Sequence, residues 1–112
     1  MSKMDNHLLI DDMLDSCRKI IAYTTDLTFE EFSKDDKTID AVIRNFEIIG
    51  EAAGRLDNVF TSLYSHIPWR DLKDYRNRLI HEYFGVDIQI VWEIIEDDLG
   101  ILIQNLESIQ RA

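Results

Sequence analysis

Apolar residues recur in this chain at steps of three and four, and this spacing constrains the fold more than any other feature of the sequence. The most regular stripe comprises Ile39, Val42, Phe46, Ile49, Ala53 and Leu56. Side chains at such steps fall on one face of an α-helix, which turns once in about 3.6 residues. The sequence therefore predicts a long amphipathic helix over residues 39–56.

Two further stripes predict helices at the ends of the chain. A helix over residues 5–24 would bury Ile10, Leu14, Cys17 and Ile21. A last helix, capped by Asp87 and interrupted only at Gly100, would bury Ile88, Val91, Ile95, Leu99, Leu102, Leu106 and Ile109.

The remaining segments are shorter. Thr28 and Glu31 form a capping-box pattern before a short turn over residues 29–32, and residues 57–67 are predicted as a loop with one short turn. Pro68 suits the first turn of another helix, which we expect to end near Gly85. Its inward-facing residues would be Leu72, Tyr75, Leu79 and Tyr83.

Four helices with short connections, and no segment of strand period, predict an all-α fold: an antiparallel up-and-down bundle of four to five helices. The length of 112 residues fits a single domain over residues 1–112. Gly50 and Gly54 have a spacing typical of close helix contact. Because a small bundle has limited core, we expect a homodimer that buries apolar surface between chains, contributed by Phe60, Trp69, Tyr75 and Phe84.

The charge is unevenly distributed. With 22 acidic and 12 basic residues the net charge is −10, which opposes binding to nucleic acid. Residues 66–84 are the exception, since Arg70, Lys73, Arg76 and Arg78 outnumber the three acidic residues there. Cys17 is the only cysteine and no apolar run is long enough to span a bilayer, so we expect a cytoplasmic protein without disulfides or membrane contact.

The sequence lacks the motifs of several common kinds of catalytic site. The Glu-x-x-His pattern of di-iron bundles is absent, and Glu47 and Glu51 are interpreted as a solvated acidic face. The four glycines are too scattered for a phosphate-binding loop. His7 and His66 are isolated and receive no role. We therefore expect neither a metal nor another cofactor.

The densest cluster of chemically useful side chains runs from Arg76 to Tyr83. On one continuous helix Asn77 and His81 would lie about 40° apart and Arg76 and Tyr83 about 20° apart. Arg76 and His81 would lie about 140° apart, so they meet only if the helix bends or if two chains face each other. A simpler alternative is that Arg76 and Arg78 pair on the surface with Asp71, Asp74 or Glu82.

These residues match R-x4-H-x-Y, the motif of the HepT-like HEPN toxins, which are encoded beside a small nucleotidyltransferase of the MntA type. Residues 45–56 (NFEIIGEAAGRL), 67–87 (IPWRDLKDYRNRLIHEYFGVD) and 91–102 (VWEIIEDDLGIL) resemble successive core segments of that family, over about half the chain. The chain departs from the family pattern at Asp74 and Tyr75, where a small residue and Met are usual, and at Gly100, where Pro is common.

The resemblance implies a metal-independent endoribonuclease, the toxin of a type VII toxin–antitoxin pair, with a composite site at a dimer interface. Two copies of His81 would act as base and acid, Arg76 would bind phosphate, and Asn77 would orient His81 or a phosphate oxygen. Arg78, Lys73 and Arg70 are candidate RNA contacts. The substrate would be an RNA such as tRNA or mRNA, and the partner an MntA-type nucleotidyltransferase antitoxin that silences the toxin by AMPylation of Tyr83.

Two alternatives remain open from the sequence. The acidic net charge favours a catalytically silent HEPN subunit that binds within a nucleotidyltransferase complex. A nucleotide-binding regulatory protein is the other, because Arg76 and Arg78 can hold a free phosphate. Both the toxin and the silent HEPN subunit could assemble beyond a homodimer, in a larger complex with the nucleotidyltransferase.

Overall fold

The computed structural model describes residues 3–81 and 85–111, with backbone alone at residues 3, 4, 80 and 81. Its elements are α1 (Lys3–Thr24), α2 (Phe29–Ser33), α3 (Asp36–Arg55), α4 (Asn58–Leu63), α5 (Trp69–Lys73), α6 (Tyr75–Leu79), β1 (Ile80–His81), β2 (Gly85–Val86), α7 (Ile88–Asp97) and α8 (Leu99–Arg111).

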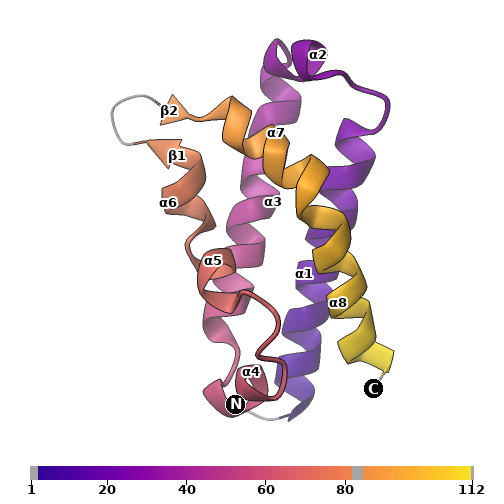
Figure 1. Cartoon of the computed structure of the whole chain (residues 1–112), viewed down its shortest axis with the longest axis vertical. Helices are drawn as coiled ribbons and strands as arrows, with labels where there is room; N and C mark the ends of the chain where they lie inside the picture. The colour runs from indigo at the N-terminus through magenta and orange to yellow at the C-terminus, as the bar shows by residue number, and fades with distance from the viewer. Residues whose placement is uncertain (1–2, 82–84, 112) are drawn as a thin grey trace.

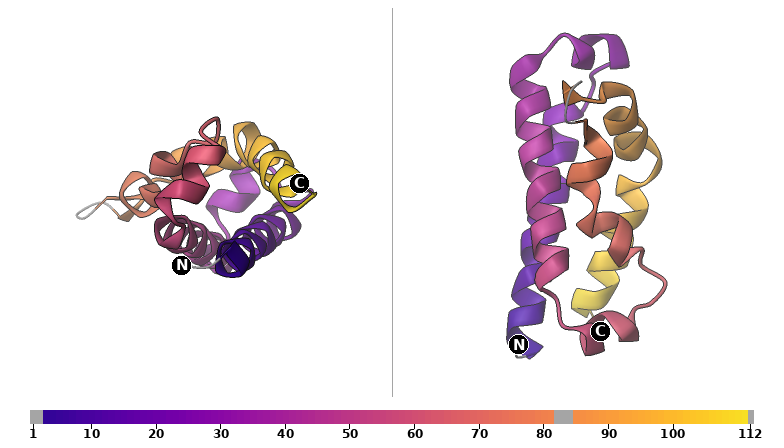
Figure 2. Two further views of the ribbon diagram at one scale, coloured as in Figure 1. Left: turned by 90° about the horizontal axis from the view of Figure 1, so that it is seen from below. Right: turned by 90° about the vertical axis from the view of Figure 1, so that its left-hand side faces the viewer.

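The helices form four columns that alternate in direction (Figure 1). α1 is the first column, α3 the second, α5 with α6 the third, and α7 with α8 the fourth. α1 packs along α3 and α8, while α3 also packs against α5 and α6. Seen along the bundle, the columns surround a common centre (Figure 2). The predicted all-α, up-and-down bundle is confirmed.

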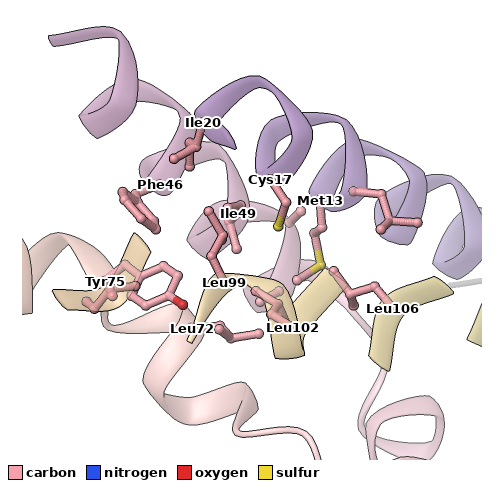
Figure 3. Close-up of a cluster of buried hydrophobic side chains, with 14 of the residues drawn as sticks. Met13, Cys17, Ile20, Phe46, Ile49, Leu72, Tyr75, Leu99, Leu102 and Leu106 are labelled. Atoms are coloured by element: carbon pink, nitrogen blue, oxygen red, sulfur yellow. The ribbon is translucent and has the colours of Figure 1, made fainter. Parts of the chain in front are cut away.

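A continuous apolar core fills the space between the columns (Figure 3). Met13 and Cys17 of α1, Ile49 of α3 and Leu99 of α8 are fully buried. Burial raises the pKa of the Cys17 thiol to about 12, so this cysteine is a neutral core residue.

The part of the chain that the structure describes contains no helix with the length and apolar character of a membrane span.

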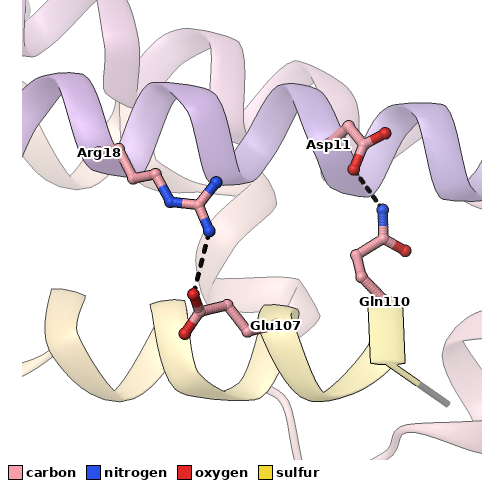
Figure 4. A network of polar contacts seen from close by, with 4 residues as sticks. All are labelled: Asp11, Arg18, Glu107 and Gln110. Atoms are coloured by element: carbon pink, nitrogen blue, oxygen red, sulfur yellow. Dashed lines mark hydrogen bonds and ion pairs between the residues drawn. The ribbon is translucent and has the colours of Figure 1, made fainter.

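Polar contacts reinforce the packing of the first helix against the last (Figure 4). The Arg18 guanidinium lies 3.0 Å from a Glu107 carboxylate oxygen, and the Gln110 side-chain amide donates to Asp11. Gln110 also donates to the backbone carbonyl of His7. These contacts hold both ends of the described chain at the same end of the bundle.

Side-chain caps begin three helices where the sequence places hydrogen-bonding residues. Thr28 and Glu31 form the predicted capping box of α2. Asp35 accepts a hydrogen bond from the Thr38 amide at the start of α3, and hydrogen bonds from Thr38 lower the pKa of the Asp35 carboxyl. Asp87 accepts from the Ile90 amide at the start of α7, as expected.

Three details of the helices differ from the sequence predictions. Ile20 rather than Ile21 faces the core of α1, because either residue continues a stripe of period 3.6 and only packing selects one. The segment predicted as a loop contains α4. The last helix is interrupted at Asp98, two residues before Gly100.

The described apolar residues that were expected at a dimer interface lie instead in the core of the single chain. Phe60, Trp69 and Tyr75 are buried within the chain itself, with 7%, 8% and 3% of their surface exposed. Phe84 lies outside the described residues. Among the described residues, the four most exposed large apolar side chains are instead Leu8, Val59, Leu63 and Ile101.

Gly50 allows α3 to approach α5 closely. A Cβ atom at residue 50 would lie 2.9 Å from the backbone carbonyl oxygen of Leu72, closer than such atoms normally approach. Gly54, one turn later, has open space around it. The predicted close helix contact is therefore confirmed at Gly50 and wrong at Gly54.

Candidate functional site

The helix that carries the candidate residues ends earlier than the sequence predicts. α5 and α6 are separated at Asp74, and α6 ends at Leu79 instead of near Gly85. Residues 80–86 are rich in β-branched and aromatic residues, which favour extended backbone. The angles expected between Asn77 and His81, and between Arg76 and Tyr83, assumed a continuous helix and therefore do not apply.

A short antiparallel ladder replaces the end of the predicted helix. Ile80 pairs with Val86 and His81 with Gly85, and the Leu79 carbonyl accepts a hydrogen bond of 2.9 Å from the Asp87 amide. Gly85 has a φ of 73°, a conformation that L-residues rarely adopt. The His81 backbone is thereby tied to the start of α7, while the His81 side chain and the whole of Tyr83 lie outside the described parts of the structure.

Tyr75 anchors α6 to the bundle. Its ring packs edge-on against the Phe46 ring of α3, with centroids 5.0 Å apart, and Leu79 at the other end of α6 is fully buried. Burial also raises the pKa of the Tyr75 hydroxyl. The short helix between these anchors holds Arg76 and Asn77 on its exposed side.

Arg76 and Lys73 line a groove between α3 and the α5–α6 column. The groove has a volume of about 190 Å³, and its other lining residues are Glu47, Gly50 and Glu51. Neither cation forms an ion pair within 4 Å to a described residue. Glu51 lies 3.9 Å from Arg44, whereas Glu47 is half-buried and has no hydrogen-bond or ion-pair partner among the described residues.

Arg78 lies on another side of α6. Its guanidinium carbon is 5.9 Å from the centroid of the Tyr75 ring, and it lines a cavity of about 220 Å³ with Asp71, Asp98 and Asn105. Residues two positions apart on a helix differ by about 200° around the helix axis, so Arg76 and Arg78 project from different sides of α6. No ion pair within 4 Å joins Arg76 or Arg78 to Asp71 or Asp74, so the surface-pairing alternative is wrong for these two carboxylates. Glu82, the third partner considered, lies outside the described residues.

Asn77 and Arg70 occupy the exposed surface of the same column. The Asn77 side-chain amide donates a hydrogen bond of 2.7 Å to the Asp74 carboxylate, which leaves its carbonyl oxygen available as an acceptor. Arg70 is exposed on α5. Of the predicted site residues, the structure brings Lys73 and Arg76 into one groove and places Arg78 in another cavity.

Glu47, like Glu51, is a groove residue that sequence reasoning missed. It was interpreted as part of a solvated face, but α3 presents it to the groove beside the cations of α5 and α6. Gly50, three residues later, carried the signal, because a glycine that permits close helix contact brings its neighbours near the opposing helix. Among the side chains that the structure describes, which do not include that of His81, no group of three or more His, Cys, Asp or Glu residues could hold a metal ion.

Comparison with known proteins gives one family match and several similar relatives. The model of a family described as "Ribonuclease HepT-like" matches residues 13–109. "Putative RNase MJ0127" of Methanocaldococcus jannaschii is 40% identical over 97% of this chain and 90% of its own length. "Probable ribonuclease HepT" of Thermococcus cleftensis is 38% identical over 91% of this chain and 93% of its own length. No solved structure gives a significant match.

Proposed function

Because the chain belongs to the ribonuclease HepT-like family, we propose that it is an endoribonuclease that cuts RNA by attack of the RNA's own 2′-hydroxyl, without a metal ion. The observation that carries the proposal is the position of Arg76. This cation is exposed and has no ion-pair partner within 4 Å among the described residues. Because it has no such partner, Arg76 is free to bind a phosphate. It lies on an anchored helix, five residues before His81.

The reaction requires two proton transfers and a stabilised charge. A base removes the 2′-hydroxyl proton, the 2′-oxygen bonds to phosphorus, and the bond from phosphorus to the 5′-oxygen breaks as an acid protonates that oxygen. The products are a 2′,3′-cyclic phosphate and a 5′-hydroxyl. His81 has the appropriate chemistry for either proton transfer, and the Arg76 guanidinium can stabilise the charge on the phosphoryl oxygens.

The scarcity of histidine supports a composite site formed by two chains. The chain has three histidines. His7 lies against Phe60 of α4, at the opposite end of the bundle from β1 (Figure 1), and His66 is exposed between α4 and α5. If base and acid are both histidines, the second must be His81 of another copy, related by a two-fold axis.

Cleavage of RNA by purified protein in EDTA tests the activity. We expect the wild-type protein to cut and His81→Ala or Arg76→Ala to lose at least about a thousandfold in rate, because each substitution removes a proton-transfer group or the phosphate cation. His66→Ala and Arg111→Ala, at exposed positions outside α6 and the groove that contains Arg76, serve as matched controls that retain activity. Full activity in His81→Ala would refute the proposed chemistry.

We propose further that the protein is a toxin neutralised by an MntA-type nucleotidyltransferase through AMPylation of Tyr83. Each AMP unit would bring a negatively charged phosphodiester near the proposed catalytic residues and hinder RNA binding. Intact-mass measurement after co-expression with the nucleotidyltransferase is the test. We expect gains in multiples of one AMP unit in the wild type and none in Tyr83→Phe; an unchanged wild-type mass contradicts this part of the proposal.

A binding subunit without catalytic activity is the second candidate, favoured by the net charge of −10 and by the carboxylates of Glu47 and Glu51 beside Arg76. Such a protein would leave RNA intact in EDTA and would still form a complex with the nucleotidyltransferase. Expression without the antitoxin separates the candidates as well, because a ribonuclease toxin arrests growth and a binding subunit does not.

A further inference from the structure

The groove beside Arg76 combines two cations and two carboxylates on facing walls. α5 and α6 supply Lys73 and Arg76, while α3 supplies Glu47 and Glu51. No ion pair within 4 Å joins the two walls, so opposite charges face each other across open space. Figure 2 shows α3 and the α5–α6 column side by side along this face.

The charges on both walls restrict what the groove can bind. A bare phosphate is attracted by Lys73 and Arg76 but repelled by the carboxylates, and a simple cation meets the opposite conflict. A ligand that carries an anion at one end and hydrogen-bond donors at the other satisfies both walls. A nucleotide within RNA has this character, with a phosphate on one side and base N–H groups on the other.

The size of the groove fits part of one nucleotide, with the rest of the unit outside it. Its volume of about 190 Å³ is below the roughly 300 Å³ at which pockets for whole drug-sized ligands begin. The close approach of Gly50 to the Leu72 carbonyl fixes the separation of α3 and α5 at the base of the groove. The walls are thus held by backbone packing rather than by the side chains that line them.

Glu47 is the carboxylate available for recognition. Glu51 is exposed and lies near Arg44, whereas Glu47 is half-buried and has no partner among the described residues. One carboxylate can accept two parallel hydrogen bonds, and guanine is the RNA base that offers two adjacent donors, N1–H and N2–H, on one edge.

We infer that this groove reads one guanosine of the RNA substrate, with its phosphate on Lys73 and Arg76 and its base edge on the Glu47 carboxylate. The inference rests on the proposed function and deepens it, because it assigns a base preference to the same site. Lys73 contributes affinity for RNA of any sequence, because it contacts the phosphate, and Glu47 contributes selectivity for guanine, because it contacts the base.

Binding of short RNAs to the His81→Ala protein tests the inference independently of cleavage. The probes are fluorescent oligouridines with a single central guanosine or inosine, which differ only by the N2 amino group. We expect guanosine to bind about tenfold more tightly than inosine, since a hydrogen bond to a charged group is lost. Adding Glu47→Gln should remove this difference, because the amide cannot accept both donors.

Two further variants separate base reading from general effects of charge. Adding Lys73→Gln should weaken both RNAs equally and keep their ratio. Adding Glu96→Gln, on the exposed surface of α7, should change neither value. Equal binding of guanosine and inosine, no binding of either, or a preference that survives Glu47→Gln overturns the inference. Wild-type cleavage in EDTA is a separate readout, so the proposed function can fail while the base preference stands, or the reverse.

Discussion

At the scale of single residues, neighbouring side chains of one type have different surroundings. Arg76 lies in a groove without an ion-pair partner within the described residues, while Arg78 lies beside the Tyr75 ring in another cavity. The family motif distinguishes them only by position. Their surroundings give a physical reason to assign the phosphate contact to Arg76.

The two glycines of α3, Gly50 and Gly54, also differ in their surroundings, and substitution of each by alanine tests the close approach of α3 to α5. Gly50→Ala should lower the free energy of unfolding by roughly 1–3 kcal/mol, because its Cβ would meet the Leu72 carbonyl at 2.9 Å. Gly54→Ala has space and should raise it by up to about 1 kcal/mol through better helix propensity. Urea denaturation of both variants at one protein concentration measures the effects, and equal stability of the two would contradict the close approach.

At the scale of secondary-structure elements, the transition from α6 to β1 determines where His81 lies. The predicted helix would have carried His81 around the helix axis, away from Arg76. The observed chain leaves the helix after Leu79 and pairs with β2 at the edge of the bundle (Figure 1). β1, whose backbone includes His81, thus becomes part of the proposed catalytic machinery.

Gly85 is the residue through which this transition can be tested. Its φ of 73° is unfavourable for an L-residue, so Gly85→Ala should strain the ladder that pairs it with His81. We expect RNA cleavage to fall by roughly ten- to hundredfold, the cost of a small misplacement of a catalytic group. Gly100→Ala, in open space on α8, is the control that should retain activity. Wild-type activity in Gly85→Ala would show that the ladder does not position His81.

At the scale of the whole molecule, the proposed chemistry requires two chains. The apolar residues first expected to cover a dimer interface belong to the core of each chain, so burial of Phe60, Trp69 and Tyr75 no longer argues for a dimer. A dimer is supported instead by the scarcity of histidine in the chain and by the position of β1 and β2 at the edge of the bundle (Figure 1).

Subunit mixing tests the requirement for two chains. When equal amounts of wild-type and His81→Ala protein exchange subunits freely, activity should fall to about one quarter of that of an all-wild-type sample, because about one dimer in four carries two intact histidines. Activity is measured as RNA cleavage in EDTA at constant total protein. A fall to one half would indicate that each chain acts alone.

The sequence by itself determined the helical class, the four-column arrangement and most helix boundaries, because periodic apolar residues and capping residues act locally. Asp87 and the capping box of Thr28 and Glu31 appear where the sequence places them. It also identified the motif residues and the family, since both are properties of residue order.

Only the tertiary structure decided which surfaces meet. It ended α6 at Leu79, selected Ile20 over Ile21 for the core, and placed Glu47 beside Lys73 and Arg76. The choice of Ile20 and the position of Glu47 depend on residues distant in sequence that compete for the same space or complete the same groove, and the end of α6 depends on strand pairing that helical periodicity does not report. Periodicity along one segment carries no information about the distance to another segment, which is why packing between columns had to settle these points.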